Sequence, residues 1–170
     1  LFVLSRLEKE GLKPSPEADR YTLIRRLSLD LLGVPPTTED ADAFVQDTDP
    51  AAYERLVDSY LASPRFGERF ARHWMDVVRY TDTYGYEWDN PAKGSHEYRD
   101  YLVRAFNADV GFDTLVREQL AGDLLPKPRL NQALGINESM IGPMFHHMGE
   151  HRHGSSIQFN GIHQEMTNNK

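Results

Sequence analysis

The sequence has no cysteine among its 170 residues. The chain therefore holds no disulfide, no thiolate metal site, no cysteine nucleophile and no covalent attachment point for haem. Long apolar runs are also missing, since no stretch approaches the ~20 residues that a membrane-spanning helix needs. Basic residues are in the minority, with 19 Lys and Arg against 26 Asp and Glu, and the net charge is −7. Proteins that bind nucleic acid need a basic surface, so this charge argues against that class.

Alternating strand-like patterns and internal repeats are absent too, whereas apolar residues recur at helical spacing along much of the chain. We expect an all-α fold, an irregular bundle of about six to eight helices joined by short connections, with a loop-rich C-terminal part. Residues 1–170 are enough for a single helical domain with its own core. The chain starts inside a helix-like pattern and without Met, so we expect it to be a segment of a longer protein.

A long central helix is predicted over residues 63–84. Ser63 is a favourable N-cap and Pro64 suits the first helical position, while Gly85 marks the expected end. Apolar and aromatic residues recur at steps of three and four, which is typical of a helix with a broad buried face. The members of this stripe are Phe66, Phe70, His73, Trp74, Val77, Val78, Tyr80, Thr81 and Tyr84.

A histidine inside an apolar stripe needs hydrogen-bond partners, and this singles out His73. One interpretation is a buried structural histidine held by a carboxylate or a backbone carbonyl. The other is a polar site made of His73, Asp76, Arg79, Asp82, Arg99 and Asp100. Arg72, Asp76, Arg79, Arg99 and Asp100 are further expected to form a buried network that fixes helix packing or tunes the local electrostatics.

Residues 82–90 combine acids with aromatic rings and form the first long irregular stretch. The candidate ligand-binding residues are Tyr84, Tyr86, Glu87, Trp88 and Asp89. Three kinds of ligand chemistry stay open: a hard cation such as Ca²⁺ held by carboxylates, a sugar stacked on the rings, and hydrolysis by the Glu87 and Asp89 pair. A solvated loop without a ligand is the fourth possibility.

Residues 124–131 are rich in proline and predict an internal linker, and residues 146–170 form a histidine-rich tail. Imidazoles bind divalent metals such as Zn²⁺, Cu²⁺ or Ni²⁺, and histidine also ligates haem iron axially. The spacing matches no zinc signature such as HExxH, and a polar tail without a metal is the alternative. The candidate ligands are His146, His147, His151, His153 and His163.

Three long stretches, residues 19–44, 53–87 and 98–125, closely resemble the cytochrome-associated domain of unknown function found in large secreted planctomycete proteins. The resemblance covers nearly the whole chain, and the three motifs occur in the family's order. It assigns no role to individual residues. The positions that match the family are His73, Trp74, Asp76, Arg79, Tyr80, Asp82, Gly85, Arg99, Asp100, Tyr101, Asn107, Gln119, Gly122 and Asp123.

The resemblance implies export from the cytoplasm and a role linked to haem. In that family the domain lies downstream of a c-type cytochrome domain and runs on into a cysteine- and histidine-containing segment, which this sequence stops short of. We therefore expect an extracytoplasmic helical domain that supports or contacts a c-type haem unit elsewhere in a longer redox protein, with other domains of the same chain as partners. Two alternatives are a carbohydrate-binding or carbohydrate-active module with polysaccharide as partner, and an interaction scaffold without a ligand.

Overall fold

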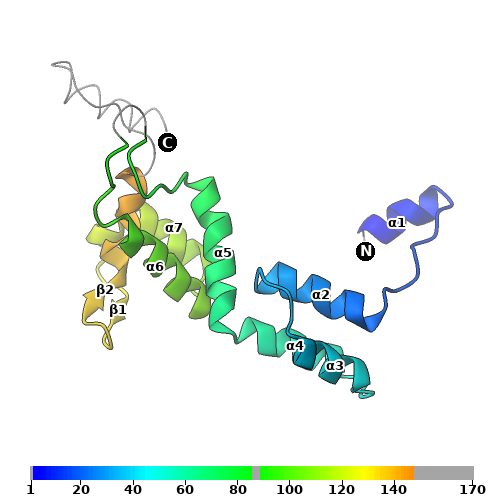
Figure 1. The fold of residues 1–170 in the computed structure, drawn as a ribbon. Helices are drawn as coiled ribbons and strands as arrows, with labels where there is room; N and C mark the ends of the chain where they lie inside the picture. The colour runs from blue at the N-terminus through cyan, green and yellow to red at the C-terminus, as the bar shows by residue number, and fades with distance from the viewer. Residues whose placement is uncertain (1, 86–88, 148–170) are drawn as a thin grey trace.

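The computed structural model describes residues 2–85 and 89–147 and has an all-α fold, which confirms the predicted class. Helices α1–α7 comprise residues Phe2–Lys9, Arg20–Leu31, Thr38–Gln46, Ala52–Leu61, Pro64–Val77, Ser95–Asn107 and Phe112–Ala121 (Figure 1). After α7 come the 3₁₀ helix η1 (Gly122–Leu124), the antiparallel strands β1 (Leu130–Asn131) and β2 (Ile136–Asn137), and the 3₁₀ helices η2 (Glu138–Met140) and η3 (Gly142–His147).

The helix starts follow the capping signals in the sequence. Asp19 accepts a hydrogen bond from the backbone N–H of Thr22 at 2.9 Å and begins α2. Thr37 caps α3 in the same way, with two acidic residues in the first turn. Ser63 and Pro64 begin α5 where the sequence predicts.

Two clusters of buried side chains form the core. The first joins α2, α3 and α4 around Ile24, Phe44 and Tyr60. The second joins α5, α6 and α7, and it includes the fully buried Tyr98 and Tyr101 of α6. In Figure 1 these helix groups lie on opposite sides of the α4–α5 connection, while α1 stands apart and has no buried residue.

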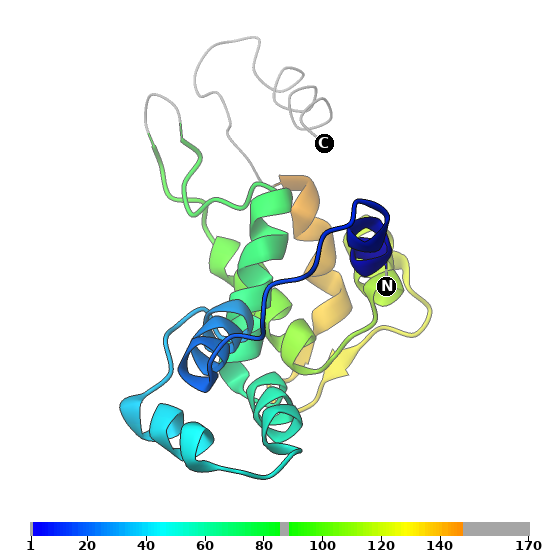
Figure 2. The same ribbon diagram turned by 90° about the vertical axis from the view of Figure 1, so that its right-hand side faces the viewer.

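Close backbone approach fixes the α5–α6 pair. A Cβ on Gly67 of α5 would lie 2.4 Å from the Val103 carbonyl oxygen of α6, so only glycine fits there. The Asn107 side chain accepts from the Gly67 N–H at 2.8 Å and donates to the Pro64 carbonyl at 3.0 Å. η3 packs against α6 and α7 and completes this half of the molecule (Figure 2).

The central helix is shorter than predicted, because α5 ends at Val77 rather than near Tyr84. Arg79 adopts a left-handed backbone with φ of +57°, and the Tyr80 N–H bonds to the Met75 carbonyl at 2.9 Å. This is the hydrogen-bonding pattern that closes a helix C-terminus. The apolar residues beyond Val77 recur at helical spacing, but they lie on irregular backbone. The spacing alone therefore does not indicate a helix there.

The buried face of α5 also differs from the predicted stripe by one position. Gly67, Ala71 and Val78 are buried, and Trp74 is partly buried against the same cluster. His73 is exposed, and Val77 is 82% exposed. Small residues at 67 and 71 allow helix α6 to come close, which rotates the contact face away from the larger aromatic residues. The interpretation of His73 as a buried structural histidine is therefore wrong.

Candidate functional site

A wide hollow on α5 gathers several of the predicted polar residues. Its volume is about 550 Å³, and its lining residues are Arg72, His73, Met75, Asp76, Arg79 and Tyr80. Because α5 closes at Val77 and the chain turns at Arg79, the residues on both sides of the helix end reach the same hollow. The structure thus places His73, Asp76 and Arg79 around one hollow.

Tyr80 connects this hollow to the next predicted residues. Its hydroxyl donates to the Asp82 carboxylate at 2.5 Å, and the Ser95 hydroxyl donates to the same oxygen at 3.4 Å. Arg99 pairs with Asp100 at 2.8 Å, which raises the Arg99 pKa, and the charges of Tyr80 and Asp82 add to that effect. The predicted polar residues therefore form one strip over the end of α5 and the start of α6.

The expectation that this strip is a buried ion-pair network is wrong. Arg72, Asp76, Arg79 and Arg99 are exposed, and the side chain of Asp100 is 43% exposed. Within the described residues, Arg72 and Asp76 form no salt bridge with each other. These positions point away from the α5–α6 contact, because that contact uses the small residues of α5 instead.

The buried ionic network lies elsewhere, around Glu118 of α7. This fully buried carboxylate accepts from the Tyr101 hydroxyl at 2.7 Å and from the Ser139 hydroxyl at 2.8 Å. The Arg129 guanidinium donates to both of its oxygens, at 3.0 and 2.9 Å. Such bidentate geometry compensates for the cost of removing a carboxylate from water.

A second buried carboxylate, Glu138, repeats the arrangement. Arg104 of α6 donates to both of its oxygens at 2.6 and 2.8 Å, and the Asn131 side chain donates at 3.0 Å. The Arg129 backbone joins the two clusters, since its N–H donates to Ser139 and its carbonyl accepts from the Glu138 N–H. Residues 124–131, predicted as a linker, thus contain a strand and an arginine that reaches the core.

Burial and hydrogen bonding act in opposite directions on these two carboxyl groups. Burial pushes the pKa of Glu118 upward, but its three side-chain partners outweigh burial and hold the pKa below the ordinary value of 4.5. The pKa of Glu138 is lowered in the same way, with burial opposed by Arg104 and Asn131. Burial also raises the pKa of Tyr101, with Glu118 adding to the shift, so this phenol stays a donor.

The buried network supports the hollow through two stacked rings. Tyr98 donates to the Gln119 side chain at 2.8 Å, next to Glu118 on α7. Its ring stacks on Tyr80, with centroids 6.5 Å apart and an interplanar angle of 15°. Tyr80 lines the hollow, so the position of its inner wall depends on the α6–α7 core.

A row of aromatic side chains runs beside the hollow. Phe66, Phe70, Phe106, Trp74 and Phe112, here called the aromatic row, follow one another with centroid distances of 4.3, 6.1, 6.1 and 5.7 Å. Phe112 at its end is 71% exposed. His73 joins the row to the hollow, because its ring meets Phe70 edge-on at 5.8 Å. The other four rings of the row are half-buried, so the aromatic surface beside the histidine and the arginines is partial.

The other predicted ligand sites are only partly described. Tyr84 and Asp89 belong to the described residues, whereas Tyr86, Glu87 and Trp88 lie outside them. In the tail, His146 packs against Phe145 with centroids 5.1 Å apart, while His151, His153, His163 and the side chain of His147 lie outside the described part. Across residues 2–85 and 89–147, no cluster of three metal-ligating side chains occurs. The helices of the same ranges include none with the length and apolarity to span a membrane.

Comparison with known proteins identifies the family of the chain. The family model of PSCyt2, described as a protein of unknown function (DUF1549), matches residues 1–169. The chain belongs to the PSCyt2 family. The resemblance to this family of unknown function, expected from the sequence, is thereby confirmed. Neither a curated protein nor a solved structure matches the chain.

The buried carboxylates of this PSCyt2 chain and their arginines are not predicted from the sequence. The signal is the helical spacing of the buried residues Leu115, Glu118 and Gln119 on α7, which Gly122 continues at the start of η1. Leu120 of the same helix is 62% exposed, so the apolar character of a residue does not mark the buried face of α7. Gln119 and Gly122 are among the family-matching positions, and a Cβ on Gly122 would lie 1.8 Å from the Ser139 carbonyl oxygen.

Arg129→Ala is expected to lower the free energy of unfolding by about 3 kcal/mol, since it leaves the Glu118 charge buried without its cation. Arg117→Ala is the matched control on α7, because Arg117 pairs with Asp113 while both side chains are 66% exposed. The control is expected to cost at most about 0.5 kcal/mol. Urea unfolding followed by circular dichroism measures both. Equal losses would contradict the role given to the buried pair.

Acid is expected to destabilise the fold through Glu118 and Glu138. Both groups have a lower pKa in the folded state than in the unfolded state, so the stability that they add is present above pH 4.5 and is lost as the pH falls through their folded values. Urea unfolding between pH 7 and pH 3 measures this dependence. Glu118→Gln should make the loss below pH 4.5 shallower. An unchanged slope in that variant would show that Glu118 is not a source of the acid sensitivity.

Proposed function

We propose that this domain contacts a c-type haem unit of a longer redox protein through the hollow on α5. The observation that carries the proposal is the exposure of His73 at the edge of a hollow lined by Arg72 and Arg79. A histidine kept for packing would be buried, whereas this one stands between the aromatic row and the cationic side chains. The family name supports a cytochrome-associated context.

The side chains around the hollow fit the periphery of a haem better than its iron. Guanidinium groups such as Arg72 and Arg79 pair well with the carboxylates of haem propionates. Met75 and Tyr80 offer apolar surface for the edge of the macrocycle. Since the chain has no cysteine, the thioether bonds of a c-type haem must come from another part of the protein. The haem supplies one-electron transfer, and this domain supplies charge and packing beside it.

The buried carboxylate–arginine network gives this contact its rigidity. The network fixes α6 against α7, and Tyr98 of α6 bonds to Gln119 of α7. The Tyr98 ring stacks on Tyr80, which lines the hollow, so the position of that wall depends on the network. A fixed arrangement of charge beside a redox centre shifts its potential by a constant amount, whereas mobile charges are screened by water. An extracytoplasmic location, where c-type haem units lie, is part of the proposal.

The test measures the haem midpoint potential of the full natural, haem-matured chain by spectroelectrochemistry. Arg72→Gln removes a positive charge that favours the more negative reduced haem, so the potential should fall by on the order of tens of millivolts. His73→Ala should leave the absorption spectrum unchanged, because the contact is with the haem periphery.

Arg117→Gln and His96→Ala are the matched controls, since both residues are exposed and lie outside the hollow. They should leave the potential within error of the natural chain. A shift in Arg72→Gln no larger than in Arg117→Gln would contradict the contact. A changed spectrum in His73→Ala would show iron ligation instead of contact with the haem edge.

A further inference from the structure

The negative charge of the chain is concentrated on the α3–α4 hairpin. Residues 37–61 contain seven acidic residues and a single basic one, Arg55, whereas the whole chain has a net charge of −7. This part lies in the first core cluster, away from the hollow on α5. A surface of this sign attracts cationic partners.

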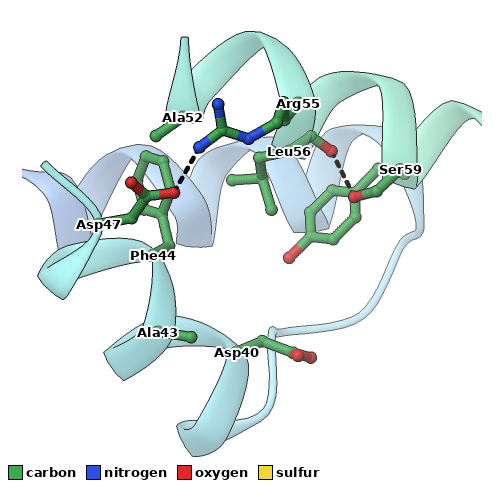
Figure 3. A pocket seen from close by; sticks show the side chains of 9 residues that line it. Asp40, Ala43, Phe44, Asp47, Ala52, Arg55, Leu56 and Ser59 are labelled. Carbon is green, nitrogen blue, oxygen red and sulfur yellow. Dashed lines mark hydrogen bonds and ion pairs between the residues drawn. The ribbon is translucent and has the colours of Figure 1, made fainter. Parts of the chain in front are cut away.

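A groove of about 300 Å³ opens between α3 and α4 in this acidic region (Figure 3). Its apolar walls are Ala43, Phe44 and Leu56. Arg20 fixes the position of Phe44, because its guanidinium lies 4.0 Å from the ring centroid and donates to the Phe44 carbonyl at 2.6 Å. The groove is therefore a formed feature with a fixed apolar floor.

The acidic residues at the groove differ in whether their carboxylates form ion pairs. Arg55 bridges Asp47 and Asp49 with two bonds of 2.7 Å, which closes the α3–α4 loop and neutralises part of its charge. Figure 3 shows the bond to Asp47. Asp40, on the other side of the groove, is exposed, and its carboxylate has no hydrogen bond or ion pair with any described residue. One full negative charge is thus available at the mouth.

A buried hydroxyl gives a second, independent sign of a ligand. Tyr60 lines the same groove and is only 8% exposed, yet its hydroxyl has no hydrogen-bond partner among the described residues. A buried polar atom in this state costs free energy. Burial raises the pKa of Tyr60 against the opposing effect of the Ser28 side chain, and the Asp40 charge acts in the same direction as burial, so the phenol remains neutral.

We propose that the α3–α4 groove binds a lysine side chain presented by a partner protein. The aliphatic stem of lysine matches the apolar floor of Phe44 and Leu56, and its ammonium has three donors for Asp40 and the Tyr60 oxygen. Since Arg55 already occupies Asp47 and Asp49, a single cation completes the site. This surface is separate from the hollow on α5, and the proposal does not rest on the haem contact.

Binding is tested by fluorescence anisotropy with the full natural chain and a dye-labelled Gly-Ser peptide that carries one central lysine. A peptide with norleucine in that position keeps the stem and loses the charge, and it should bind about tenfold more weakly. Tyr60→Phe should weaken the lysine peptide about threefold or more while the unfolding temperature stays the same or rises, because the variant removes an unsatisfied buried hydroxyl. A purely structural tyrosine would not give these opposite effects.

Asp40→Asn should weaken the lysine peptide about tenfold. Asp58→Asn is the matched control, since Asp58 is an exposed acid of α4 that does not line the groove. Equal weakening by the two variants would reduce the effect to general charge attraction and overturn the proposal. Equal binding of the norleucine peptide would overturn it as well.

Discussion

The bidentate pair between Glu118 and Arg129 is the interaction on which the C-terminal half depends. It brings a residue from an irregular stretch into the core beside α6 and α7, and the Arg129 backbone then holds Ser139 and Glu138. A buried carboxylate is tolerable only while every oxygen is compensated. The pair therefore couples segments that have little helical packing of their own, and an error in any one of them exposes an unpaired charge.

The sequence predicts the fold class and most helix starts, because caps and periodic apolar residues are local signals. Ser63, Asp19 and Thr37 begin helices as their side chains lead one to expect. It fails at the end of α5, where Arg79 adopts a left-handed backbone that glycine usually takes. It also fails on the orientation of α5, since the close approach at Gly67 depends on the Val103 carbonyl of another helix.

Local sequence signals also indicate part of the candidate site. His73, Asp76 and Arg79 are near one another along the chain, so helical spacing brings them to one region. Glu118 and Arg129 are joined across a proline-containing stretch, and Glu138 meets Arg104 from 34 positions away. No local pattern marks such partners. Charged residues are usually exposed, and that tendency favoured solvated positions for residues that the fold buries.

Under the proposed function, a rigid helical domain presents the hollow on α5 and its arginines to a neighbouring haem unit. The buried ion pairs make the α6–α7 half rigid. The polar residues of α5 are exposed because α5 packs on α6 through its small residues. The acidic groove between α3 and α4 gives the domain a second surface of opposite charge. Two such surfaces suit a domain that holds a position between partners.

If the proposed contact exists, the haem unit covers the hollow on α5. Carbethoxylation of histidine by diethyl pyrocarbonate, followed by mass spectrometry on the full haem-matured chain, tests this most directly. His96 is an internal reference, since it is exposed on α6 outside the hollow. We expect His73 to react much more slowly than His96. Equal reaction rates at the two histidines would mean that nothing covers the hollow and that the haem contact does not exist.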